Sequence, residues 1–175
     1  RKNGKTLLAS AIMEYMVFAD GEYGADAFCL APKVEQADIV YSAFWQSAIL
    51  DSELKEKVKH RKNDIYIAET NSSVKKIALN AKTSDGFNPH FSCQDEIAAW
   101  SGDKGLKGYE VIKSGLGSRD QPIALSITTA GYENDSIYDE LMKRSTRFLL
   151  GESKEKRLLP ILYMIDDVEN WNQIT

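Results

Sequence analysis

The residues best suited to chemistry open the chain, in a basic run that ends in Gly-Lys-Thr. The run consists of Arg1, Lys2, Asn3, Gly4, Lys5 and Thr6. Its last three residues fill the final places of the phosphate-binding P-loop, whose full pattern is Gly, four residues, then Gly-Lys-Ser/Thr. Backbone N–H groups of such a loop, at the start of the helix that follows, bind phosphate oxygens. The run therefore predicts a nucleoside triphosphate site.

Each residue type in this run suits a phosphate ligand. Gly4 lets the backbone approach the ligand closely, and the Lys5 ammonium would contact the β- and γ-phosphates. The Thr6 hydroxyl would be a Mg²⁺ ligand, while Arg1 and Lys2 would add positive charge beside the same phosphates. A Gly-Lys-Thr triplet can also be an ordinary solvated helix start, because so short a pattern recurs by chance.

A second reactive pair, Asp95-Glu96, follows the extended run Phe91-Ser92-Cys93-Gln94. In a P-loop ATPase, an Asp at a strand end holds Mg²⁺ through water, and the next Glu orients and polarises the attacking water. We therefore expect Asp95 to serve the metal and Glu96 to act in catalysis together with Lys5. The alternative is a solvated strand end without a catalytic role.

Composition limits the remaining possibilities. Hydrophobic residues make up 43% and charged residues 27% of the chain, as in soluble globular proteins. The net charge of −4 gives no global basic field, although a local Lys/Arg patch would suffice for DNA contact. Cys29 and Cys93 are expected to be reduced core residues, and His60 and His90 are too separated for a metal site. Neither a signal peptide nor a membrane-spanning apolar run is visible.

Apolar periodicity predicts helices that alternate with strands. The expected helices span residues 6–19, 34–58, 104–118 and 135–149, the last capped near Asn134 or Asp135. The expected strands span residues 25–31, 64–68, 74–79, 91–96, 122–128 and 158–165, with turns at 70–73 and 85–89. This pattern predicts an α/β sandwich with a mainly parallel central sheet, whose strands bring their carboxyl ends to one edge. Asp95-Glu96 and Thr128-Thr129 should then lie at the same edge as Lys5.

Four segments in this order resemble the ATPase domain of bacteriophage terminase large subunits. They are the basic phosphate loop at residues 1–6, the acidic-pair segment at 85–100, the Ser-Ile-Thr-Thr-Ala-Gly run at 126–131, and the segment 159–171. The resemblance implies an ASCE-type P-loop NTPase that uses ATP and Mg²⁺ to drive double-stranded DNA into a procapsid. It also implies that Thr128 and Thr129 sense the γ-phosphate and couple hydrolysis to motion.

The resemblance further implies partners and boundaries. The expected partners are double-stranded DNA, the small terminase subunit, the portal protein and further copies in a homo-oligomeric ring, in the cytoplasm of an infected bacterium and without a membrane. Residues 1–165 would form the ATPase domain, and 166–175 would begin the linker to a nuclease domain. Because the chain starts in mid-motif without Met, we expect a fragment that lacks the strand before the loop. Such a fragment should bind and hydrolyse ATP weakly, with a gap or a substituted strand in its sheet.

Several residues remain open to more than one interpretation. Phosphoryl transfer needs a basic finger, for which the sequence offers Lys82, Arg119, Arg144 and Arg147, each otherwise a surface charge. Asp166 and Asp167 favour an acidic linker over a nuclease site, and the aromatic residues Phe44, Trp45 and Trp100 favour the core over base stacking. A helicase-like P-loop ATPase and a non-hydrolysing structural or assembly module are the alternative functions. Glu96 argues against the second, since an inactive ATPase need not keep that carboxylate.

Overall fold

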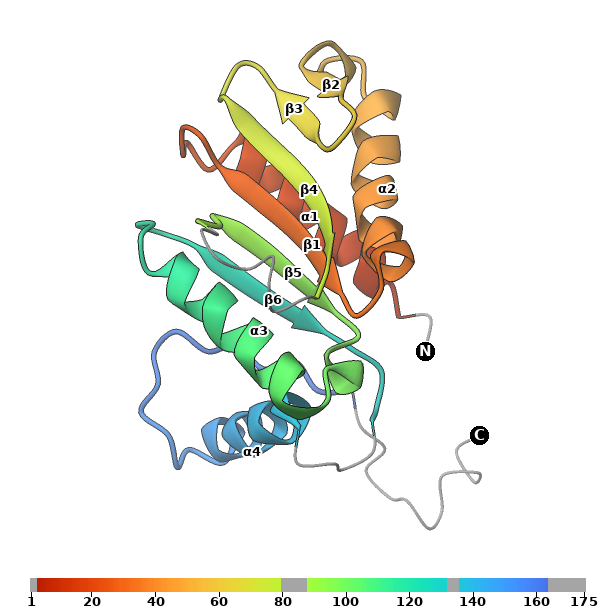
Figure 1. The fold of residues 1–175 in the computed structure, drawn as a ribbon. Helices are drawn as coiled ribbons and strands as arrows, with labels where there is room; N and C mark the ends of the chain where they lie inside the picture. The colour runs from red at the N-terminus through yellow and green to blue at the C-terminus, as the bar shows by residue number, and fades with distance from the viewer. Residues whose placement is uncertain (1–2, 80–87, 132–135, 164–175) are drawn as a thin grey trace, which may run out of the picture. The chain divides into compact units, whose positions relative to one another are not determined.

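The computed structural model describes residues 3–79, 88–131 and 136–163, and the chain divides into two compact parts, residues 1–139 and 140–175. In the first part, one sheet carries helices on both faces, with α1 and α2 on one side and α3 on the other (Figure 1). Within the described residues, no helix is both long enough and apolar enough to cross a membrane.

The elements follow the alternation that the sequence predicts. They are α1 (Lys5–Phe18), β1 (Asp26–Ala31), α2 (Val34–Leu50), η1 (Leu54–Glu56), β2 (Val58–His60), β3 (Ile65–Ile67), β4 (Ser72–Ala78), β5 (Phe91–Asp95), η2 (Ile97–Ala99), α3 (Gly102–Leu116), β6 (Ile123–Ile127) and α4 (Ile137–Leu149). The strand order is β2-β3-β4-β1-β5-β6. The pairs β4–β1, β1–β5 and β5–β6 are parallel, and β2–β3 and β3–β4 are antiparallel. The predicted α/β fold with a mainly parallel sheet is therefore confirmed.

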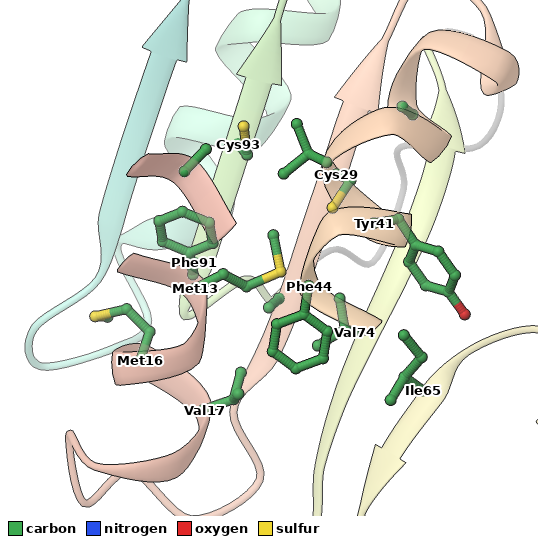
Figure 2. Close-up of a cluster of buried hydrophobic side chains, with 14 of the residues drawn as sticks. Met13, Met16, Val17, Cys29, Tyr41, Phe44, Ile65, Val74, Phe91 and Cys93 are labelled. Atoms are coloured by element: carbon green, nitrogen blue, oxygen red, sulfur yellow. The ribbon is translucent and has the colours of Figure 1, made fainter. Parts of the chain in front are cut away.

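The core lies between the sheet and the two helices α1 and α2 (Figure 2). β1 is buried at nearly every position, as expected for a central parallel strand that pairs with β4 on one side and β5 on the other. Cys29 of β1 and Cys93 of β5 are register partners, and both are buried free thiols, as predicted. Burial raises the pKa of both thiols, which keeps them protonated and unreactive. Phe44 and Trp100 are also buried, which confirms their core assignment.

The helix predicted over residues 34–58 is too long. α2 ends at Leu50, because the Asp51 carboxylate accepts hydrogen bonds from the backbone N–H groups of Glu53 (2.8 Å) and Leu54 (2.9 Å) and starts η1 instead. The next residues form the short strand β2, which the sequence analysis missed. The polar turn predicted at 70–73 is also shorter than expected, since Ser72 and Ser73 already pair within the sheet.

Two expectations about strands are wrong. Residues 158–163 form no strand, because no described strand pairs with them, and residues 164 and 165 lie outside the described part of the chain. The sheet also has neither a gap nor a substituted strand among its described members, since each neighbour from β4 to β6 pairs directly. β6 is instead an outer strand whose Ile123 is 39% exposed.

The cap predicted near Asn134 or Asp135 lies outside the described residues, but a capping contact is present at the start of α4. The Ser136 backbone N–H donates to Asp139 Oδ2 (2.9 Å), and the Ser136 hydroxyl lies 3.3 Å from the same oxygen. This contact resembles one half of a capping box. In the second part of the chain, Arg144 binds Glu155 through two Nε contacts of 2.8 and 2.9 Å.

Candidate active site

The carboxyl ends of β5 and β6 bring two polar segments together. Asp95 is the register partner of Ile127, so Glu96 and Thr128 both follow directly at the same edge of the sheet. The Ala98 backbone N–H donates to Thr128 Oγ1 (3.2 Å), and the Thr128 hydroxyl donates to the Thr129 carbonyl (2.8 Å). One hydroxyl therefore connects the turn after Glu96 with the end of β6.

Asp95 is a buried carboxyl group, with 8% of its surface exposed. Burial raises its pKa, and the neighbouring Glu96 carboxylate raises it further; the Glu96 N–H (2.8 Å to Asp95 Oδ1) and the Lys5 charge act in the opposite direction. Val17, near the end of α1, accepts a hydrogen bond from Thr70 just before β4, so α1 ends at the amino ends of the strands. It therefore begins at their carboxyl ends (Figure 1), where the Lys5 charge acts on Asp95. The ends of two strands and the start of one helix thus converge at this point.

Glu96 has left-handed backbone angles, φ 53° and ψ 45°. For a residue with a side chain this conformation costs about 1–2 kcal/mol, and such strain is concentrated at functional sites. The turn is held from behind by Trp100, which is 1% exposed and whose Nε1–H donates to the Asp95 carbonyl (3.0 Å). The structure thus fixes the direction in which the chain leaves Asp95.

Gly105 makes this support possible. A Cβ atom at Gly105 would lie 2.4 Å from the Trp100 carbonyl oxygen, so only glycine allows α3 to pack this closely behind the turn. The sequence analysis assigned Trp100 to the core but missed that it also positions Asp95. The signal available was its place four residues after Glu96, in the segment Asp-Glu-Ile-Ala-Ala-Trp.

A second link joins β5 to β6 on the face of the sheet opposite α1. The Ser126 hydroxyl donates to Gln94 Oε1 (2.5 Å), and the Gln94 amide donates to Ser92 Oγ (3.2 Å). Gln94 is 1% exposed, so its amide satisfies its hydrogen bonds inside the protein. A polar network therefore runs between β5, which ends at Asp95, and β6, which ends just before Thr128.

The beginning of α1 has the geometry of an anion site. Gly4 has φ 72°, which glycine adopts without strain, and no side chain caps the helix. The backbone N–H groups of the first turn and the helix dipole therefore favour a negatively charged ligand. Lys5 and Thr6 are half-buried there, Asn3 is exposed, and Arg1 and Lys2 lie outside the described residues.

The residues at this edge fit a Mg²⁺ site that is completed by water and phosphate better than a metal site made of protein ligands alone. Mg²⁺ keeps several waters and takes one or two carboxylates together with substrate phosphates. Asp95 and the Thr6 hydroxyl are oxygen donors of that kind. Among the described residues, no group of three or more His, Cys, Asp or Glu side chains could hold a metal ion.

Of the candidate finger residues, Arg119 lies in the same part of the chain as Asp95 and can be placed relative to it. Arg119 precedes β6, at the amino ends of the strands, where it binds Glu22 (2.6 Å) and the Gly24 carbonyl (2.8 Å). Arg144 is bound to Glu155 within the second part of the chain. Arg147 is exposed in the last turn of α4, and Lys82 lies outside the described residues. Arg119 is thus committed to a structural contact at the end of the sheet opposite Asp95.

Comparisons with known proteins agree with this geometry. The model of the family described as terminase large subunit, ATPase domain, matches residues 1–147. Protein YmfN of Escherichia coli K12 is 29% identical over 90 residues, which cover 51% of this chain and 19% of that protein.

Two solved structures share the fold. The HK97 bacteriophage large terminase has a TM-score of 0.72 at 20% identity, covering 91% of this chain and 35% of that one. The large terminase ATPase domain of Thermus phage P74-26 has a TM-score of 0.60 at 20% identity, and the match covers 77% of this chain and 58% of that one. The chain thus spans about a third of the HK97 protein. Since the family match covers most of its residues, the chain belongs to the terminase large subunit ATPase domain family.

Proposed function

We propose that this chain is the ATP-hydrolysing motor domain of a terminase that drives double-stranded DNA into a procapsid. The observation that carries the proposal is the burial of Asp95 at a sheet edge that also holds Glu96, Thr128 and the Lys5 charge. Burial disfavours the ionised form of Asp95, and a metal ion bound with nucleotide would offset that cost.

The proposed roles follow from position and chemistry. The N–H groups at the start of α1, with Gly4 and Lys5, would bind the phosphates of ATP, and Arg1, Lys2 and Asn3 would lie beside them. Thr6 and Asp95 would hold Mg²⁺, which neutralises phosphate charge as it develops. Glu96 would orient the attacking water, because its strained backbone fixes the carboxylate beyond the end of β5.

The coupling of ATP hydrolysis to motion is proposed to run through β6. Thr128 and Thr129 would respond to the γ-phosphate, and the hydrogen bond from Ala98 to Thr128 supports a link to the segment that follows Glu96. The further partners in this proposal are the small terminase subunit, the portal protein and other copies in a ring. The proposed setting is the cytoplasm of an infected bacterium.

Lys5→Ala tests the nucleotide site in a protein that carries these residues in their native context. Loss of the ammonium should weaken ATP binding and lower turnover together, turnover by about 100-fold or more, because it removes fixed positive charge from the phosphates. Lys104→Ala, an exposed lysine of α3, is the matched control and should leave both quantities unchanged. Parental turnover in Lys5→Ala would contradict the proposal.

A further inference from the structure

One segment of this acidic chain is strongly basic. Residues 55–62, which run from η1 through β2, contain five Lys or Arg residues and one Glu, a net charge of +4 in a chain of net charge −4. We refer to this segment as the basic hairpin arm. It lies at the β2 edge of the sheet, the edge opposite β6 (Figure 1).

The arm is held firmly in place. His60 packs against Trp45 of α2, with ring centroids 5.2 Å apart, and against Tyr41, with centroids 6.0 Å apart. Val58 packs against the core cluster, and β2 pairs with β3 in a register that places Lys59 opposite Tyr66. A surface fixed in this way loses little conformational entropy when it binds a partner.

Two of the five basic side chains are already paired and three are not. Lys57 binds Glu69 (2.8 Å), and Arg61 binds Asp64 (2.6 Å). Lys55, Lys59 and Lys62 are exposed and have no ion-pair partner among the described residues. These three lysines can therefore contact anions without first breaking an internal ion pair. Several such cations on one edge make a surface for a polyanion.

The chemistry of the arm favours a phosphate backbone over single-stranded bases. Beside the arm, the Arg61 guanidinium lies over one face of the Tyr66 ring of β3, 4.1 Å from the ring centroid. Within the arm, the His60 ring makes an edge contact with Trp45 of α2. Residues 55–62 contain no Phe, Tyr or Trp, so the arm itself supplies none of these rings for base stacking. β2 is also an outer strand, so its free backbone N–H groups can donate to phosphate oxygens.

We infer that the basic hairpin arm is the surface by which this domain contacts the phosphate backbone of double-stranded DNA. The inference rests on the proposed function, which supplies duplex DNA as the translocated substrate. Contacts of this kind are independent of sequence, as a motor that moves along any DNA requires. The arm lies across the sheet from β6, so DNA contact and the phosphate chemistry would occupy separate surfaces.

The test is duplex binding by the chain without nucleotide, measured by fluorescence anisotropy over a range of salt concentrations. The triple variant Lys55→Ala, Lys59→Ala, Lys62→Ala should bind a mixed-sequence duplex at least about tenfold more weakly at low salt, with a salt slope smaller by about 2 to 3. The control Lys104→Ala, Lys107→Ala, Lys113→Ala removes the same charge from exposed positions of α3 and should bind like the parent. Circular dichroism checks that both variants are folded.

Three results would overturn the inference: no duplex binding by the parent, equal losses in the two triple variants, or single-stranded DNA competing as well as duplex. ATP turnover without DNA separates this inference from the proposed function. If the arm variant keeps parental duplex affinity while Lys5→Ala loses turnover, only the inference about the arm fails. If Lys5→Ala keeps parental ATP turnover while the arm variant loses duplex affinity, the proposed ATPase function fails instead.

Discussion

The two ends of β5 use polar residues in opposite ways. At the amino end, His90 Nε2 lies 2.7 Å from Asp20 Oδ2, and Arg119 is bound to Glu22 and Asn88. At the carboxyl end, Asp95 is buried without an ion-pair partner among the described residues, and Glu96 has a strained backbone. Polar groups at the first end pair with one another and stabilise the fold, although the buried His90 Nδ1 has no hydrogen-bond partner among the described residues. Those at the second end leave a demand for positive charge, which a ligand can meet.

The two ends are far enough apart to be tested separately. A strand rises roughly 3.3 Å per residue, so His90 and Asp95 are separated by about 17 Å. Substitutions more than about 10 Å apart without shared partners usually have additive effects on stability. Changes at the amino end should therefore alter stability and leave nucleotide chemistry intact. Changes at the carboxyl end should alter nucleotide chemistry and have smaller effects on stability.

The largest effect on stability should come from Arg119→Ala. This change removes a guanidinium that is 13% exposed and leaves Glu22 without its partner, which should lower the free energy of unfolding by about 2–4 kcal/mol. Lys57→Ala, which breaks an exposed pair with Glu69, is the control and should cost at most about 1 kcal/mol. Urea denaturation measures both. If the two variants lost similar free energies of unfolding, the Arg119–Glu22 pair would stabilise the fold no more than an exposed surface ion pair does.

A smaller effect, of opposite sign, is expected from Glu96→Gly. Glycine adopts φ 53° without strain, so the variant should be more stable by about 1 kcal/mol while ATP turnover is lost. Asn71 has the same φ of 53° in the turn before β4, and Asn71→Gly should change stability by only a few tenths of a kcal/mol, because Asn tolerates this conformation. If the Glu96→Gly variant were less stable than the parent, the Glu96 side chain would have to stabilise the fold.

The smallest effect is a pH-dependent difference in Tm between Asp95→Asn and the parent. The Asp95 pKa is raised in the folded chain, so the unfolded chain ionises first and the parent loses stability as the pH rises from about 4 through the raised pKa. Asn does not ionise, so the variant loses no stability in this way. The two Tm values should therefore coincide below about pH 4, and the variant should melt higher at neutral pH.

Addition of ATP and Mg²⁺ should reverse that order, because the parent gains more stability from binding than the variant does. Scanning calorimetry across pH, with and without ATP and Mg²⁺, measures both differences. A parent that melts higher than Asp95→Asn at neutral pH without ligand would show that burial of Asp95 is already compensated.

The sequence was most informative where the signal was local. Lys5, Asp95 and Glu96 could be proposed as site residues because a P-loop and an acidic pair each occupy adjacent positions next to an apolar run. The end of α2 could not be located, since helical periodicity continues past Asp51 and only its side-chain bonds stop the helix. The strand expected at 158–165 depended on a pairing partner, which an apolar run alone does not supply.

Contacts between distant segments were also invisible in the sequence. The Trp100 bond to the Asp95 carbonyl needs the 3-10 turn η2, and the pair of Gln94 and Ser126 needs the register of two strands. Arg119 could be considered a catalytic finger from its position between a helix and a strand. Only the fold shows that it binds at the amino ends of the strands.

Glu96 is proposed to orient the attacking water at a site that also holds Lys5 and Asp95. The most direct measurement is ATP turnover by Glu96→Gln alongside ATP affinity, in a protein that carries these residues in their native context. The amide keeps the size of the side chain and removes the charge, so affinity should stay near the parental value while turnover falls by about 100-fold or more. Turnover at the parental rate would contradict the account, because another residue would then have to orient the water.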